Sequence, residues 1–90
     1  MVLAVLGLNH KTVSVDIREK FSISEESARD GLLHLSEQEG IKEAVVLSTC
    51  NRTEIYAVLK EEEDKEELYR FFLTLSGNSK AEKEYFFFYT

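Results

Sequence analysis

The chain has 90 residues, of which 43% are hydrophobic and 31% are charged, and its net charge is −6. This composition indicates one folded domain with a modest core and excludes a disordered segment, because it combines ample apolar surface with moderate charge. The acidic balance excludes nucleic-acid binding driven by charge alone, since neutralising phosphates requires clustered Lys and Arg.

The short apolar runs and the lone cysteine bear on where the protein works. The longest apolar stretches, residues 2–6 and 44–47, are far too short to span a bilayer. The N-terminus lacks the charged region and cleavage site of a signal peptide. A single cysteine, Cys50, excludes an intrachain disulfide and favours a reducing compartment. We therefore expect a cytoplasmic protein without a membrane segment.

The first half of the chain predicts a strand followed by a helix. Residues 2–8 are a near-continuous apolar run, which is typical of a buried strand. Residues 10–23 are mixed and leave room for a short helical turn. Ser24, followed by two glutamates, is a good helix start, an apolar face follows it, and Gly40 is well placed to end that helix.

The second half predicts two strands, a helix and a final strand. Residues 43–49 and 54–60 are the two strands, separated by residues 50–53. The next helix is indicated by one apolar stripe at i, i+3, i+4 and i+7, made by Leu68, Phe71, Phe72 and Leu75. The last strand is predicted over residues 84–90 and carries an aromatic run over residues 85–89. This run is bulkier than a half-exposed strand should be, so we expect further chain or a partner to cover it.

The order of these elements predicts the fold class. The series β-α-β-β-α-β is the split βαβ arrangement of ferredoxin-like folds. We therefore expect a single α+β domain over residues 1–90, with an antiparallel sheet and two helices on one of its faces.

Metal and nucleotide sites are not predicted. His10 and His34 do not form a metal-ligand spacing with Cys50, and His34 is expected at the rim of the first helix. The chain contains no GxGxxG motif, so it offers no nicotinamide site.

Cys50 is the main candidate for chemistry, and two interpretations of it stand side by side. A lone cysteine at a strand end is often a small buried hydrophobe. Here, however, the sequence becomes polar directly after it, and Arg52, two positions on, would favour the reactive thiolate form. Thr49 and Asn51 add hydrogen-bonding groups around the same turn. A histidine base is missing nearby, and His10 is the only candidate in this half of the chain.

Two motifs carry a resemblance to a known family. GLNHKTVSVDIREKF at residues 7–21 and STCNRTEIY at residues 48–56 resemble the N-terminal region of glutamyl-tRNA reductases. They stand in the family's order and spacing, and a weaker similarity extends over the whole chain. Many relatives have a small residue and a proline where this chain has Val13 and Ser14, a departure that does not touch the chemistry.

The resemblance implies an NADPH-dependent oxidoreductase that opens tetrapyrrole, and hence porphyrin, biosynthesis. The family's motif cysteine, here Cys50, attacks the ester of glutamyl-tRNA and forms a glutamyl thioester, which NADPH reduces to glutamate-1-semialdehyde. The family residues that bind the glutamyl group correspond to Thr49, Asn51 and Arg52. A guanidinium suits the substrate's free side-chain carboxylate, because its fork can donate two parallel hydrogen bonds.

The resemblance also implies what this chain lacks. Relatives continue with the rest of the catalytic domain, including a histidine that assists the cysteine, then an NADPH-binding domain and a helical domain that makes the enzyme a homodimer. We therefore expect residues 1–90 to be the N-terminal part of the catalytic domain, inactive in reduction by itself. The alternative is a small ferredoxin-like ligand-binding or regulatory module in which Cys50 is structural.

Overall fold

The computed structural model describes residues 1–90 and contains four strands, three α-helices and three short 3-10 turns. The strands are β1 (Val2–Asn9), β2 (Ile41–Ser48), β3 (Arg52–Leu59) and β4 (Phe87–Tyr89). The helices are α1 (Val15–Lys20), α2 (Glu25–Leu33) and α3 (Lys65–Leu75), and short 3-10 turns cover Leu35–Glu37, Glu62–Asp64 and Lys83–Tyr85.

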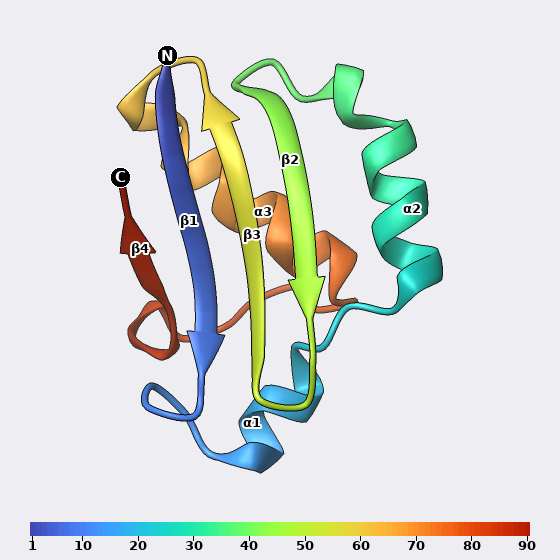
Figure 1. The fold of residues 1–90 in the computed structure, drawn as a ribbon, viewed down its shortest axis with the longest axis vertical. Coiled ribbons are helices and arrows are strands. Elements are labelled where there is room, and N and C mark those ends of the chain that lie inside the picture. Colours follow the sequence, from blue (N-terminus) through green and yellow to red (C-terminus); the bar gives the residue numbers. More distant parts are fainter.

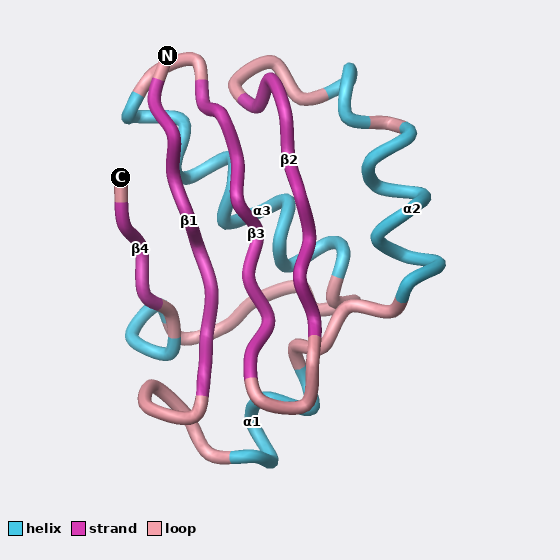
Figure 2. Tube along the Cα trace, viewed as in Figure 1, coloured by secondary structure: helices cyan, strands magenta, loops and turns pink.

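The four strands form one antiparallel sheet in the order β2-β3-β1-β4 (Figure 1). The two central strands are not consecutive in sequence, because α1, α2 and β2 all lie between them along the chain. This is the strand order of the ferredoxin-like arrangement, so the α+β fold expected from the sequence is confirmed. Helix α3 lies behind the sheet, and α2 runs beside β2 at its edge (Figures 1 and 2).

The two faces of the sheet differ because neighbouring residues of a strand point to opposite sides. The face towards α3 carries the buried residues of the central strands: Ala4, Leu6 and Leu8 from β1, and Ile55, Ala57 and Leu59 from β3. Helix α3 adds its predicted stripe, of which Phe72 and Leu68 are fully buried. Burying each such side chain stabilises the fold by roughly 1.5–3 kcal/mol, so the core lies between the sheet and α3.

The opposite face of the sheet is open. Leu3 on β1, Val45 on β2 and Tyr89 on β4 are 70%, 64% and 65% exposed. The aromatic run is therefore split by alternation: Phe86 and Phe88 pack against the core, and Tyr89 lies on the open face. The ring of Phe86 makes edge contacts with Phe72 at 5.1 Å between ring centroids.

Helix α2 begins as predicted and ends earlier than predicted. The Ser24 hydroxyl accepts a hydrogen bond from the Ser27 amide at 3.0 Å, which is an N-cap. The helix ends at Leu33 instead of near Gly40, because the chain turns there and brings Leu35 against the core. A Cβ on Gly31 would collide with the side chain of Leu75, so this glycine allows α2 to approach α3 closely.

Other boundaries also differ from the sequence prediction. The last strand, predicted over residues 84–90, is confined to Phe87–Tyr89, because Lys83–Tyr85 form a 3-10 turn. Residues 15–20, expected to be at most a turn, form the complete short helix α1. Residues 52 and 53, expected in the connection, belong to β3, where Thr53 is buried and pairs with Ser48. The connection between β2 and β3 is therefore only residues 49–51 long, which makes the segment around Cys50 a tight hairpin loop.

Candidate functional site

The loop that carries Cys50 is held by hydrogen bonds of Thr49. The Thr49 amide donates to the Arg52 carbonyl at 2.8 Å and closes the hairpin. The Thr49 hydroxyl accepts from the amides of Asn51 and Arg52, both at 3.2 Å, and its proton points to the Arg52 carbonyl at 3.4 Å. These contacts leave Cys50 and Asn51 as the loop residues whose side chains are exposed without a partner in the hairpin.

Cys50 is a free, exposed thiol. It borders a cleft of about 390 Å³ between α1 and the hairpin, together with Arg18, Ser48 and Thr49. A cysteine that served only packing would be buried, as most structural cysteines are. The exposure and the adjoining cleft instead suit a nucleophile that a ligand can reach.

Hydroxyl groups hold the two strand ends from which the hairpin loop starts. The Ser48 hydroxyl accepts a hydrogen bond from the Ile23 amide at 3.1 Å and lies 3.2 Å from the hydroxyl of Thr53. Thr53 is only 1% exposed. The base of the loop is thus fixed both to the segment before α2 and to β3, although the loop itself is exposed.

Arg52 lies on the open face of the sheet, at the start of β3. It is paired in register with Asn9 of β1, and its Nε lies 3.8 Å from a carboxylate oxygen of Glu54. Its side chain is 53% exposed, so the guanidinium can still meet a ligand. Arg52 does not border the cleft beside Cys50.

Glu54 is a buried carboxylate on the otherwise open face. It is 6% exposed and accepts a hydrogen bond from the Tyr56 hydroxyl at 2.8 Å. Its register partner is Gly7, where an added Cβ would lie 2.8 Å from Glu54 Cγ and 2.7 Å from the Thr53 carbonyl oxygen. Gly7 therefore provides the space that Glu54 occupies, and the hydrogen bond to Glu54 raises the pKa of Tyr56.

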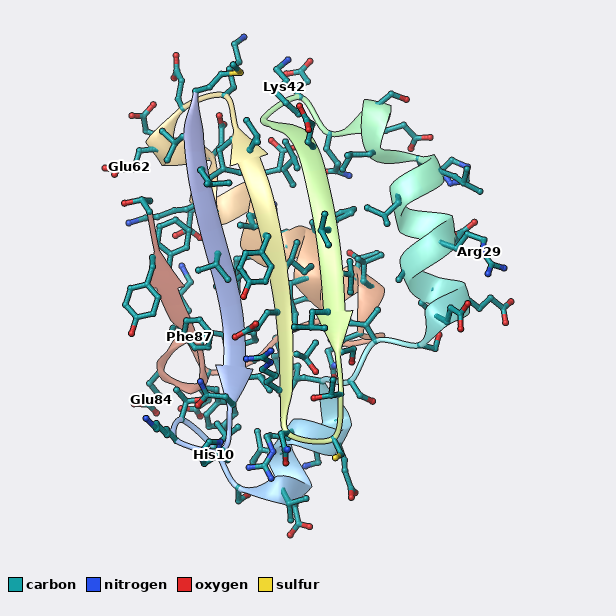
Figure 3. The ribbon with its side chains drawn as sticks, viewed as in Figure 1. His10, Arg29, Lys42, Glu62, Glu84 and Phe87 are labelled. Atoms are coloured by element: carbon teal, nitrogen blue, oxygen red, sulfur yellow. The ribbon has the colours of Figure 1, made fainter.

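The two histidines lie at different places. His10 is exposed in the turn after β1, at the same end of the sheet as α1 and the hairpin (Figure 3). His34 follows α2, where its ring contacts the Asp30 carbonyl at 2.9 Å, and this contact raises its pKa. His34 is exposed, as expected for a rim residue.

Two general features of the molecule complete the description. No three side chains of His, Cys, Asp or Glu come together in a way that could hold a metal ion. No helix has the length and apolar character needed to cross a membrane.

Sequence reasoning identified the loop but missed two of its neighbours. Arg18 reaches the loop from α1, and its Nε donates to the Cys50 carbonyl at 3.4 Å across 32 positions of sequence. Glu54 is buried because it is paired with Gly7 of β1, and this pairing cannot be read from the sequence. The only available signal was membership in the two motifs, since Arg18 lies in the first and Glu54 in the second.

Together, the fold and the site define an α+β domain of ferredoxin-like topology that presents an accessible cysteine on a tight hairpin. Residues 6–90 match the family model described as Glutamyl-tRNAGlu reductase, N-terminal domain. The chain belongs to this family.

Similar proteins carry the same description. The chain is 44% identical over 78 residues to the glutamyl-tRNA reductase of Desulforudis audaxviator and 47% identical over 78 residues to that of Synechocystis. Each match covers 87% of this chain and 18% of the relative. The solved glutamyl-tRNA reductase from Methanopyrus kandleri superimposes with a TM-score of 0.58 at 34% identity, over 78% of this chain and 16% of that one. The chain thus spans less than a fifth of the length of these proteins.

Proposed function

We propose that this chain is the N-terminal, cysteine-bearing part of a cytoplasmic, NADPH-dependent glutamyl-tRNA reductase, a homodimer that makes glutamate-1-semialdehyde for tetrapyrrole biosynthesis. In this proposal Cys50 takes the glutamyl group from glutamyl-tRNA as a thioester. The observation that carries the proposal is the exposed Cys50 on a hydrogen-bonded hairpin loop beside a cleft, in a chain of this family.

The proposed step is a transfer from oxygen to sulfur. The Cys50 thiolate attacks the carbonyl carbon of the aminoacyl ester, and a carbon–sulfur bond forms. The bond from that carbon to the ribose oxygen then breaks, and the released hydroxyl takes up the proton that the thiol gave up. The thioester is more reactive than a free carboxylate, so the acyl group is ready for reduction.

Three side chains around Cys50 have separate roles in this proposal. The resemblance implies that Thr49 binds the glutamyl group, but its hydroxyl already serves two amides and one carbonyl, so we propose that it shapes the loop. Asn51 offers a free amide to the polar atoms of the glutamyl group. Arg52 binds the side-chain carboxylate of the substrate, since its guanidinium is exposed and its weak contact with Glu54 leaves donors available.

NADPH does not fit the residues of this chain. A Rossmann-type dinucleotide site is built on parallel strands and a glycine-rich turn that leads into a helix, whereas this sheet is antiparallel throughout. In the proposal the cofactor is bound by another domain of the enzyme. The 90 residues alone should therefore fail to oxidise NADPH when glutamyl-tRNA is supplied, and measured semialdehyde production by this chain would contradict that.

The alternative function is a small ligand-binding module with a structural cysteine. The exposure of Cys50 argues against it, because a thiol in contact with solvent contributes little to packing. A thiol-selective alkylating agent separates the two functions. We expect rapid modification of Cys50 at neutral pH without loss of the folded structure, whereas a structural cysteine would react only as the chain unfolds.

The direct test is to mix the enzyme with glutamyl-tRNA in the absence of NADPH and to examine Cys50 by mass spectrometry. We expect a glutamyl adduct on Cys50 that hydroxylamine removes, as it removes thioesters. The matched control is Cys50→Ser, which should form no such adduct. A wild-type enzyme without any adduct would overturn the proposal.

A further inference from the structure

We propose that Arg18 is a positioning residue for the nucleophile, which it serves by tying α1 to the carbonyl of Cys50. The inference rests on the proposed function of Cys50 and adds a residue to it. Neither the composition of the hairpin nor the hydrogen bonds within it would identify Arg18, because this residue lies outside the hairpin, in helix α1.

Arg18 connects two segments that the sequence keeps far apart. Its Nη1 donates to the carbonyl of Val13 at 2.9 Å, and its Nε donates to the carbonyl of Cys50 at 3.4 Å. Val13 is buried in the core, so the first contact anchors the guanidinium to a fixed point. The second contact reaches the exposed loop from that anchor.

The burial of Arg18 distinguishes it from the other arginines. Arg18 is half-buried, whereas Arg29, Arg52 and Arg70 are exposed. A long charged side chain loses conformational freedom when it is held in this way, which costs free energy unless contacts compensate. The two carbonyl contacts provide that compensation, because hydrogen bonds from a charged donor are stronger than neutral ones.

The contact with the Cys50 carbonyl acts on the residue that reacts. The hairpin's own hydrogen bonds join Thr49 to Asn51 and Arg52, and none of them reaches the carbonyl of Cys50. Arg18 thus restrains the carbonyl of Cys50, and the Thr49 hydroxyl holds the Asn51 amide of the same peptide group. Arg18 therefore adds the restraint from outside the hairpin that sets the direction of the thiol towards the cleft. Misplacing a reacting group by about 1 Å can cost on the order of a hundredfold in rate, so this restraint is expected to affect the chemical step.

The guanidinium also borders the cleft in which Cys50 lies. From the sequence, Arg52 was expected to be the positive charge near the Cys50 thiol, but Arg52 lies on the open face of the sheet. In the structure it is Arg18 that shares the cleft with the thiol, with Glu19 as the other charged residue there. Arg18 therefore has one role in this inference, that of holding the loop, while the carboxylate of the substrate remains assigned to Arg52.

The test compares Arg18→Gln and Arg18→Lys with the same changes at Arg29, an exposed arginine on α2 that pairs with Glu25 at 3.2 Å. Three quantities are measured in the full-length enzyme: the single-turnover rate of Cys50 thioester formation, the dissociation constant for glutamyl-tRNA in a Cys50→Ser background, and the melting temperature. The Cys50→Ser background reports affinity without reaction.

We expect Arg18→Gln to lower the rate about tenfold or more, in line with a loss of correct orientation. Arg18→Lys should recover part of the rate, because an ammonium can reach one carbonyl but cannot bridge both. The dissociation constant should stay within about twofold, as expected when binding contacts are kept and only a later step is affected. The Arg29 variants should match the wild type in all three measurements.

Several results would overturn the inference. A wild-type rate in both Arg18 variants would show that the loop needs no such restraint. A weaker dissociation constant at an unchanged rate would make Arg18 a substrate-binding residue, and a lower melting temperature alone would make it a structural one. If Arg18→Gln does not fold, Arg18→Lys decides by the same criteria. A wild-type enzyme that forms no thioester contradicts the proposed function itself, so the two failures are distinguishable.

Discussion

The covered face of the sheet and its hairpin end are built from different interactions. The covered face is apolar: its residues Leu8 and Ile55, and Phe72 of the covering helix α3, have no exposed surface. The hairpin end is exposed and polar. It is held by the Thr49 hydroxyl, which accepts a hydrogen bond from the Arg52 amide, and by Arg18, which donates one to the Cys50 carbonyl.

Stability is therefore located mainly in the core, and the proposed chemistry is located at the hairpin end. Burial of apolar side chains contributes most of the free energy of folding, and exposed hydrogen bonds contribute little to it. Residues of the hairpin can therefore be optimised for reactivity at small cost to the fold. Substitutions in the two regions should consequently change different quantities.

The largest expected effect is on stability, and β1 offers a matched pair to measure it. Leu8 is fully buried, and Leu3 on the same strand is 70% exposed on the open face. Leu8→Ala should lower the free energy of unfolding by about 2–5 kcal/mol, because it leaves a cavity in the core. Leu3→Ala should change it by no more than about 0.5 kcal/mol. Denaturant unfolding of the 90-residue chain measures both, and equal losses would break the distinction between the faces.

A smaller effect, on activity alone, is expected at the hairpin end. Arg52→Lys keeps the charge but loses the two-pronged geometry for a carboxylate, so kcat/KM for glutamyl-tRNA should fall roughly tenfold to a hundredfold. The melting temperature should stay unchanged, because Arg52 is exposed. Full activity in the Lys variant would remove Arg52 from the site, and a parallel fall in melting temperature would make it structural.

The open face should show a change in titration. The hydrogen bond to Glu54 raises the pKa of Tyr56, so Glu54→Gln should bring that pKa back towards its ordinary value. The associated stability is complete below the ordinary tyrosine pKa and is lost as pH rises through the raised one, so the variant should lose less stability in alkali. Absorbance titration against a Tyr56→Phe control measures the shift, and an unaltered titration would show that Glu54 does not act on Tyr56.

The smallest effect is expected at an exposed ion pair away from the site. Lys83 contacts both carboxylate oxygens of Glu66 at 2.8 Å and lowers the pKa of that carboxyl. The pair contributes stability above the ordinary glutamate pKa, and this is lost as pH falls through the lowered one. Lys83→Met should slightly flatten the acid side of the stability profile and leave Cys50 alkylation unchanged. A large loss of unfolding free energy at neutral pH would show that this ion pair contributes to stability as much as a core residue does.

The fold could be predicted because its signals are periodic and local. Short apolar and aromatic runs indicated the strands, and the four-residue stripe of α3 indicated its buried face. Helix α1 was missed as a full helix because six residues are too few to display a period. The end of α2 was missed because it depends on how Leu35 meets the core, which is a tertiary contact.

The site could be predicted only in part for a related reason. Cys50 and its neighbours were identified because they are adjacent in sequence and matched a motif. The contact of Arg18 with Cys50 crosses 32 positions, and the burial of Glu54 depends on its pairing with Gly7. Neither contact is visible before the strands are placed in register.

The most direct test of the central claim, that Cys50 is an accessible nucleophile on a chain stabilised elsewhere, is the mass of Cys50 after incubation of the enzyme with glutamyl-tRNA without NADPH. We expect a hydroxylamine-sensitive glutamyl adduct on Cys50 that is absent from Cys50→Ser, and equal melting temperatures of the two proteins. An unmodified Cys50 in the folded wild type, or a marked loss of stability in Cys50→Ser, would contradict it.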